Sequence, residues 1–184
     1  KAARAIKNHG ASPDDPWDAY GMLGYNYHIT EASAALGVSQ MQRIESIVAR
    51  RNVIADYYNE MLALCPDVVL PPSASNLHIS RFVYVIQIAK WFDTHDRNQL
   101  MERLKERGVA TRNYFPCIHL SPFYRKRFGY IPGTFPIAEG FADRALALPF
   151  FHAITHEQIQ YVVKCLTEEI CALRRKFRCI VRDS

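Results

Sequence analysis

The sequence predicts an α+β fold, in which a long helix precedes a small, mainly antiparallel sheet packed with helices. Apolar residues recur at helical spacing over 30–64, and three shorter segments rich in β-branched and aromatic residues alternate with helical patterns after it. This order is typical of one small layer of strands covered by helices. With 184 residues, 49% of them hydrophobic, the chain is long enough to form a core without disulfides or metals.

The chain opens with a short helical pattern and a long loop. Residues 1–9 are helical in pattern and end at His9 and Gly10, since glycine commonly follows the last turn of a helix. Residues 10–29 are dense in turn-forming residues and lead into the unusual run GYNYHITE. Because the sequence begins within a helical pattern and without Met, we expect it to be a piece of a longer protein.

A long amphipathic helix is expected next. Thr30 is a good N-cap residue, and Glu31 suits the positive end of a helix. The helix should run to about Leu64, with a bend or a close contact at Gly37. Its apolar stripe from Leu36 onwards is too long for a small domain to cover alone, so we predict that it lies at a two-fold interface.

The rest of the chain alternates between strands and helices. The expected elements are, in order: a connector at 66–75, a strand at 81–89, a helix capped by Asp93 or Thr94 and ending at Arg107–Gly108, a strand at 109–115, a long aromatic loop with a short helix near Tyr124, a helix at 137–144, a short strand in 145–151, and a last helix that opens with a capping box at Thr155 and ends near Leu173.

Composition narrows the class of protein. The formal net charge is +5, and basic residues crowd 174–184, which we interpret as a solvated tail and not as a nucleic-acid site. No apolar run reaches the ~18 residues of a membrane span, and the start does not resemble a signal peptide. Five cysteines without a C-x-x-C pair favour reduced thiols in the cytoplasm.

Common catalytic and metal signatures are absent from the sequence. It contains no G-x-G-x-x-G, P-loop or G-x-S-x-G motif. His152 and His156 have helical spacing, but Thr155 should cap the helix and leave His152 outside it. We therefore predict no metal site.

Two loops hold the candidate binding residues. Asn26 is either a turn residue or a hydrogen-bond donor held between two tyrosines and suited to a phosphate oxygen; His28 is either a packing residue or a cation facing an anion. The loop 112–125, with its aromatics, His119 and two arginines, is either a lid over an anionic ligand or a surface loop packed on the core.

Four separated stretches resemble one known family. KNHGASPDDPWDAYGMLGYNYHITEASAALGVSQMQRIE is similar to the beginning of the second domain in DegT/StrS-type sugar aminotransferases, where G-x-N-x-R-M-T-E precedes a helix. RNYFPCIHLSPFYRKRFGY, FPIAEGFADRALALPFF and THEQIQYVVKCL resemble later family segments in the same order. These are fold type I enzymes that use pyridoxal 5'-phosphate (PLP). The resemblance, over about residues 2–166, implies the C-terminal part of such an enzyme.

The resemblance implies roles for five residues. In a homodimer, Asn26 would bond the PLP phosphate of the partner subunit. His28 stands where Arg is usual and would contact the nucleotide-sugar; His119 would line the same pocket, with Tyr114 and Tyr124 as neighbours. The family's Schiff-base lysine lies before the H-G segment, so we expect no catalytic residue in this chain and no activity from the chain alone.

The implied organisation has three parts. Residues 1–29 would be the end of the large PLP-binding domain and the interface loop, 30–173 the long helix with the small domain, and 174–184 the basic tail. The implied activity moves an amino group from glutamate or glutamine to a nucleotide-linked keto-sugar. Two alternatives stay open: a sugar dehydratase of the same family, in which histidine replaces the lysine, and a free-standing small domain that serves binding or oligomerisation.

Overall fold

The computed structural model describes residues 1–11, 20–72 and 79–180, with side chains up to Arg174. The chain divides into two compact units, Lys1–Glu45 and Ser46–Ser184. Helices and a three-stranded sheet are both present, which confirms the predicted α+β class.

The unit Lys1–Glu45 contains α1 (Ala2–Lys7) and α2 (Glu31–Met41). The end of α1 is as predicted, because the Gly10 amide donates to the Ala5 carbonyl at 2.8 Å and Gly10 has a φ of 84°. The N-cap of α2 is also confirmed, since the Ser33 amide donates to Thr30 Oγ1 at 3.3 Å.

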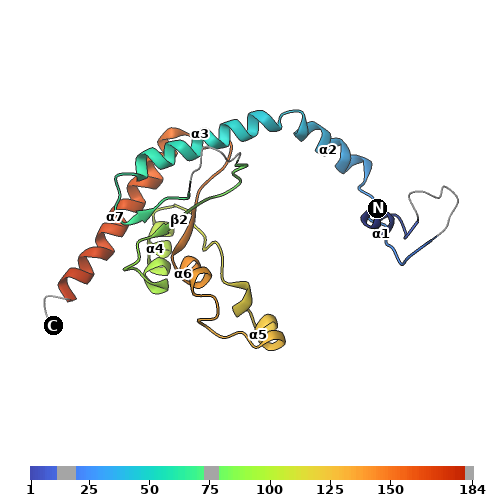
Figure 1. The fold of residues 1–184 in the computed structure, drawn as a ribbon. Coiled ribbons are helices and arrows are strands. Elements are labelled where there is room, and N and C mark those ends of the chain that lie inside the picture. The colour runs from blue at the N-terminus through green and yellow to red at the C-terminus, as the bar shows by residue number, and fades with distance from the viewer. Residues whose placement is uncertain (12–19, 73–78, 181–184) are drawn as a thin grey trace. The chain divides into compact units, whose positions relative to one another are not determined.

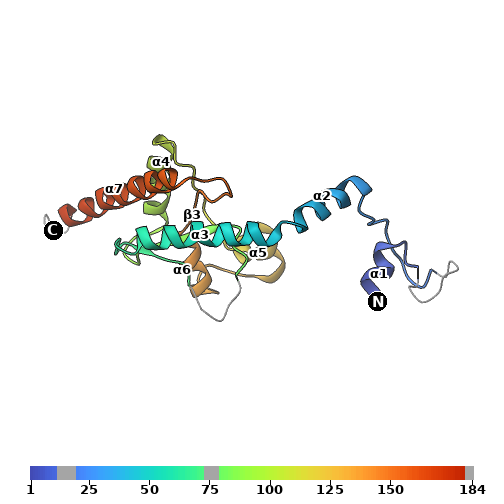
Figure 2. The ribbon, with the colours of Figure 1, turned by 90° about the horizontal axis from the view of Figure 1, so that it is seen from above.

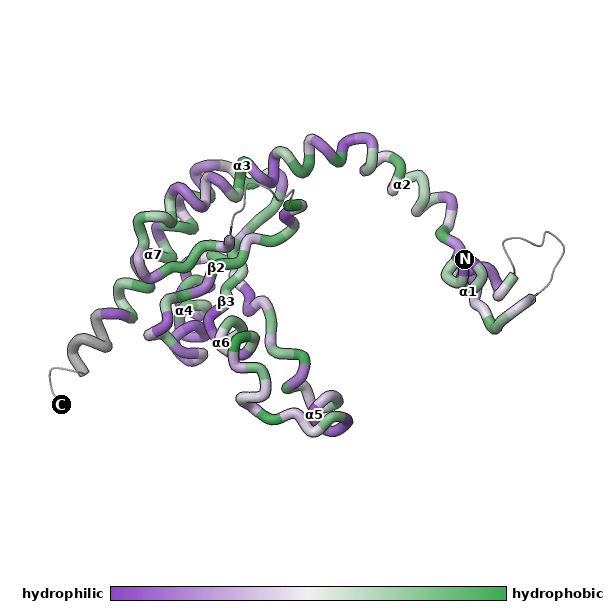
Figure 3. The backbone as a smooth tube through the Cα atoms, in the orientation of Figure 1, coloured by the Kyte–Doolittle hydropathy of each residue, from purple (hydrophilic) through white to green (hydrophobic). Residues whose placement is uncertain are grey.

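The prediction of a single long helix from Thr30 to about Leu64 is wrong. α2 ends at Met41, and α3 (Ile44–Leu62) begins after a short turn. The break has a local cause: the Arg43 amide donates to the Gln40 carbonyl at 3.2 Å, three residues back, which tightens the last turn. Gly37 lies inside α2 and does not interrupt it. Apolar residues continue on both sides of the turn (Figure 3), which is why the sequence pattern suggested one helix.

An antiparallel sheet forms the centre of Ser46–Ser184. Its strands are β1 (Val68–Val69), β2 (Tyr84–Ile88) and β3 (Ala145–Leu148), in the order β1-β2-β3 (Figure 1). Alternate residues of β2 are buried, and all of β3 is buried. The strand at 81–89 is thus confirmed over its second half, whereas β1 lies in the predicted connector.

The predicted strand at 109–115 does not form. Only Arg112 pairs there, by two backbone hydrogen bonds with Ala147 of 3.2 and 2.8 Å. Pro116 follows shortly and has no amide hydrogen, so it could not donate to a continued ladder.

Helices cover the sheet and the loops beside it. They are α3, α4 (Thr94–Glu106), the 3₁₀ turn η1 (Ile118–Leu120), α5 (Pro122–Phe128), α6 (Pro136–Arg144) and α7 (His156–Ile180). α4 packs on α7 (Figure 2), and α6 contacts α4 and β2. The predicted caps are present: Asp93 opens α4 with a capping box, and Thr155 exchanges hydrogen bonds of 2.9 and 3.2 Å with Gln158.

The core of this unit comes from α3, the sheet, α4 and α7. Among its fully buried members are Ile54, Tyr58, Leu62, Ile86, Leu100, Leu104, Ile159 and Leu166. Tyr58 buries its ring but still donates its hydroxyl hydrogen to the Pro149 carbonyl at 2.8 Å. The small sheet is therefore held by helices drawn from three separate stretches of sequence.

α7 continues past the predicted end near Leu173, as far as Ile180. Arg174, the first residue of the predicted tail, lies 3.1 Å through Nη1 from Oδ2 of the buried Asp67 and 5.7 Å from the ring of Trp91. Arg174 is therefore part of the folded unit.

Candidate functional site

The segment that carries Asn26 pairs with the end of α1. The Tyr25 amide donates to Ile6 at 2.7 Å, the His9 amide to Tyr25 at 3.0 Å, and the Tyr27 amide to Lys7 at 2.9 Å. These backbone bonds place Asn26 opposite Asn8 in an antiparallel bridge.

Glycines permit the close approach of these two segments. A Cβ on Gly10 would lie 1.8 Å from the Met22 carbonyl oxygen, and one on Gly24 would lie 2.0 Å from the Gly10 nitrogen. The glycine of G-x-N is thus required by packing. Gly10 and Gly24 together fix the position from which Asn26 projects.

Asn26 is exposed and not held between two tyrosines, which corrects that interpretation. Tyr25 and Tyr27 stack on each other, with ring centroids 5.1 Å apart and planes 11° apart. Alternate residues of an extended segment share a face, so the rings lie together and the amide points to the other side. Asn26 Oδ1 accepts a long hydrogen bond of 3.4 Å from the His28 amide. This contact leaves the Nδ2 group of Asn26 as a donor.

His28 is joined to the end of α1 through its side chain. Its Nε2 lies 2.9 Å from Oδ1 of Asn8, and its ring centroid is 6.5 Å from that of His9. A hollow of about 280 Å³ adjoins the ring; we call it the α1 hollow. Its lining residues are Arg4, Lys7, Asn8, Ala11 and His28.

His119 in the other unit is fixed by a carboxylate. Its Nε2 lies 3.0 Å from Oε1 of Glu139, which also accepts hydrogen bonds from the Gly133 amide at 2.7 Å and the Phe135 amide at 3.0 Å. These two amide bonds, and then the His119 contact, hold the pKa of Glu139 below its ordinary value. Glu139 thereby ties η1 and the loop before α6 to the first turn of α6.

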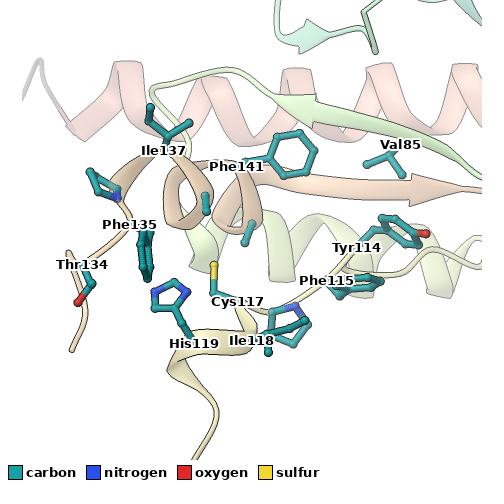
Figure 4. A pocket seen from close by; sticks show the side chains of 14 residues that line it. Val85, Tyr114, Phe115, Cys117, Ile118, His119, Thr134, Phe135, Ile137 and Phe141 are labelled. Carbon is teal, nitrogen blue, oxygen red and sulfur yellow. The ribbon is translucent and has the colours of Figure 1, made fainter. Parts of the chain in front are cut away.

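An open pocket of about 900 Å³ lies beside this contact (Figure 4). His119 and Tyr114 both line it, so the structure brings these two predicted residues together. Most of the other lining side chains are apolar, among them Val85, Phe115, Ile118, Ile137 and Phe141. The pocket therefore offers a mostly apolar surface with a few polar side chains, among them His119, Tyr114 and Thr134.

Tyr124 is not part of that pocket. It lies on α5, where its ring contacts Phe123 at 5.3 Å and Phe128 at 6.2 Å between centroids. Together with Phe135 these residues belong to a segment, 117–135, in which no residue is buried. We call this segment the aromatic lobe.

Sequence reasoning did not identify Glu139, Asn8 or Lys7. Glu139 could have been found, because an acid in the first turn of a helix that begins with Pro136 can bond amides of the preceding loop. Asn8 and Lys7 gave no such signal, since their neighbours come from a segment some 20 residues away.

Within the described residues, no group of three His, Cys, Asp or Glu side chains could hold a metal ion. His156 stacks on Tyr57 instead, with centroids 4.4 Å apart, and His152 lies before α7. None of the helices in the described part of the chain is both long and apolar enough to cross a membrane.

The fold is that of part of a fold type I aminotransferase, and the sequence identifies the family. Residues 1–167 match the profile of the DegT/DnrJ/EryC1/StrS aminotransferase family, to which this chain therefore belongs. The resemblance seen in the four sequence stretches is confirmed.

Individual relatives agree with this assignment. The protein MJ1066 of Methanocaldococcus jannaschii is 30% identical over 173 residues, which are 89% of this chain and 45% of that protein. The structure of DesV from S. venezuelae is 26% identical, with a TM-score of 0.78 over 90% of this chain and 42% of that chain. PseC of Helicobacter pylori, an aminotransferase of pseudoaminic acid biosynthesis, shares the fold at 18% identity, with a TM-score of 0.79 over 90% and 44% of the two chains. The chain thus spans less than half the length of these relatives.

Proposed function

We propose that this chain is the C-terminal part of a PLP-dependent enzyme that transfers an amino group from glutamate or glutamine to a nucleotide-linked keto-sugar. Family membership over residues 1–167 carries the proposal. When bound, PLP would take up the amino group from the donor and pass it to the ketone of the sugar. The residues of this chain would hold the cofactor and the substrate in place.

Asn26 suits the phosphate of PLP. Its Oδ1 is occupied by the His28 amide, and its Nδ2 group is an exposed donor that a phosphate oxygen can accept from. Glycine packing fixes the backbone on both sides of the contact. We propose that Asn26 reaches the cofactor of the partner subunit in a homodimer, with α2 at the interface.

The remaining candidates would act on the substrate. The α1 hollow, which Arg4 and Lys7 line beside His28, presents positive charge and suits an anionic group. His119 and Tyr114 line the apolar pocket and suit the sugar part of the substrate, with Glu139 fixing the His119 ring. Tyr124 lies on the aromatic lobe and does not line this pocket.

The test is Asn26→Ala in the full-length protein. Loss of one hydrogen bond to a charged acceptor should weaken PLP retention by about ten- to a hundredfold. Equilibrium dialysis against PLP, followed by cofactor absorbance, measures this. Gln42→Ala is the matched control, because it removes an exposed amide from the turn after α2 and should leave PLP affinity unchanged.

A mixing experiment tests the partner contact. When Asn26→Ala subunits are mixed with subunits whose cofactor-binding lysine is replaced, one site of each heterodimer joins an intact lysine to an intact Asn26. Activity should then return in part. Unchanged PLP affinity in the single variant, or no rescue in verified heterodimers, would contradict the proposed role of Asn26.

A further inference from the structure

The carboxylate of Glu139 is held in one orientation by the backbone. Its Oε2 accepts a hydrogen bond of 2.7 Å from the Gly133 amide, and its Oε1 accepts one of 3.0 Å from the Phe135 amide. Both amides precede α6, and Glu139 lies in the first turn of that helix. These bonds also hold the pKa of Glu139 below its ordinary value, so the carboxyl group is ionised at neutral pH.

The ionised carboxylate determines which ring nitrogen of His119 carries a hydrogen. A carboxylate can only accept a hydrogen bond, so Nε2 of His119 donates to Oε1 of Glu139 across their 3.0 Å contact. In a neutral ring the other nitrogen, Nδ1, then has a free lone pair and can only accept. The two side chains are 12% and 15% exposed, and such a contact is stronger where water is largely excluded.

Two aromatic rings hold the plane of the His119 ring. Its centroid lies 4.8 Å from that of Phe135 and 6.0 Å from that of Tyr130, with interplanar angles of 82° and 89°. This edge-to-face arrangement is a favoured one for aromatic pairs. His119 also lines the pocket of about 900 Å³ (Figure 4). Because Glu139 occupies Nε2, Nδ1 is the ring nitrogen that remains for a molecule in this pocket.

We propose that His119 and Glu139 act as a dyad, in which Nδ1 of His119 accepts a hydrogen bond from one hydroxyl group of the bound sugar and Glu139 is the positioning residue. A carboxylate that fixes the tautomer and orientation of a histidine has the same effect in catalytic triads. Most of the pocket wall is apolar, so a hydroxyl without a partner there would be costly. The dyad therefore selects a molecule with that hydroxyl over one without it. The identity of this molecule as a nucleotide-linked sugar rests on the proposed function.

The first experiment determines the state of the ring in the 184-residue chain labelled with ¹⁵N-histidine. At about pH 8, above the range in which histidine is ordinarily protonated, long-range ¹H–¹⁵N spectra should show a hydrogen on Nε2 of His119 and none on Nδ1. The Nε2 hydrogen should exchange slowly with water. In Glu139→Gln, which removes the charge, it should exchange at least about tenfold faster.

Glu106→Gln is the matched control, because Glu106 is an exposed glutamate of α4 and its loss should leave the ring spectrum unchanged. Amides of β2 should stay equally protected in both variants, which shows that the sheet is intact. A hydrogen on Nδ1 in the wild-type chain at this pH would make His119 a donor and would overturn the proposal. Equal exchange of the Nε2 hydrogen in wild type and Glu139→Gln would overturn the role of Glu139.

The second experiment tests the hydroxyl contact in the full-length protein by calorimetry. Its probes are UDP-glucose, dTDP-glucose, their analogues that each lack one sugar hydroxyl, and UDP and dTDP alone. Glu139→Gln should weaken binding of the glucose compound about tenfold and leave that of the nucleotide unchanged. One deoxy analogue should bind wild type and Glu139→Gln equally, because it has already lost the contact.

An equal loss of affinity for the nucleotide alone, or the same loss for every deoxy analogue, would mean that Glu139 only supports the lobe and would overturn the hydroxyl contact. If the wild-type protein binds none of these probes, the substrate class of the proposed function is wrong and the hydroxyl contact fails with it. The ring spectra, which need no substrate, still decide whether the dyad exists.

Discussion

In Ser46–Ser184 the apolar side chains of α3, the sheet, α4 and α7 converge on one core, whereas in Lys1–Glu45 the apolar side chains of α2 stay at the surface. Leu166 and Leu104 are fully buried, but Leu36 is 64% exposed and Met41 is 66% exposed. No residue of α2 is buried. The second unit thus buries the apolar side chains of these elements in a core of its own, whereas the first unit leaves the apolar side chains of α2 for something else to cover.

This difference shows what each unit can do by itself. In the second unit, one buried core joins the antiparallel sheet to α3, α4 and α7. In the first unit, order rests on the backbone pairing of α1 with 25–27 and on helix caps. We therefore propose that α2 completes its packing against a second copy of the protein, in agreement with the proposed site across two subunits.

The largest expected effect is on stability, and two leucine substitutions, one in each unit, test whether only the second unit depends on a buried core. Leu166→Ala removes a buried side chain from α7 and should lower the free energy of unfolding by about 2–5 kcal/mol. Leu36→Ala removes the same group from the surface of α2 and, when the chain is measured as a monomer, should change it by less than about 0.5 kcal/mol. Urea denaturation followed by circular dichroism measures both. Equal losses in the two variants would mean that α2 is packed within its own subunit.

The next largest effect should come from placing a charge on α2, which should weaken dimerisation without changing the fold. Leu36→Asp places a carboxylate in the proposed interface and should weaken dimerisation of the full-length protein by at least about tenfold, with the fold intact. Sedimentation velocity over a range of protein concentrations gives the dissociation constant. Leu64→Asp is the control, because Leu64 is 91% exposed but lies beyond the end of α3. A monomeric wild-type protein at micromolar concentration would contradict the interface.

Local signals were enough to predict much of the fold. Thr30, Asp93 and Thr155 bond amides within a few residues of themselves, so their roles as caps can be read from sequence. The strand β2 was found because β-branched and aromatic residues crowd it. In contrast, β1 has two residues and owes its conformation to pairing with β2, which no short window reveals.

The site was predicted only in part, for the same reason. Resemblance to the family pointed to Asn26 and His119 by their motifs. The partners that position the two histidines, Asn8 for His28 and Glu139 for His119, each lie 20 residues away in the sequence. Contacts of this kind depend on how the chain folds back on itself. The turn between α2 and α3 was not predicted, because apolar residues continue at helical spacing on both sides of it and suggested one helix.

The aromatic lobe is an exception within the second unit. It belongs to Ser46–Ser184 but, like α2, has no buried residue. A single carboxylate, Glu139, links three parts of it: His119, Gly133 and Phe135. The lobe should therefore respond to pH where the core does not. Because the folded pKa of Glu139 is lowered, its contribution is complete above the unfolded carboxyl value of about 4.3 and is lost as the pH falls through the lower folded value.

Amide hydrogen exchange tests this smallest effect. Protection of the Gly133 and Phe135 amides, corrected for intrinsic exchange, should fall as the pH is lowered through the folded pKa of Glu139. The Thr155 amide is an internal control, because it donates to the uncharged Gln158 side chain at 2.9 Å. In Glu139→Gln, protection at Gly133 and Phe135 should be lower throughout and lose this pH dependence. If the protection of these two amides followed that of the Thr155 amide at every pH in the wild-type chain, packing of the aromatic rings, and not the carboxylate of Glu139, would hold the lobe.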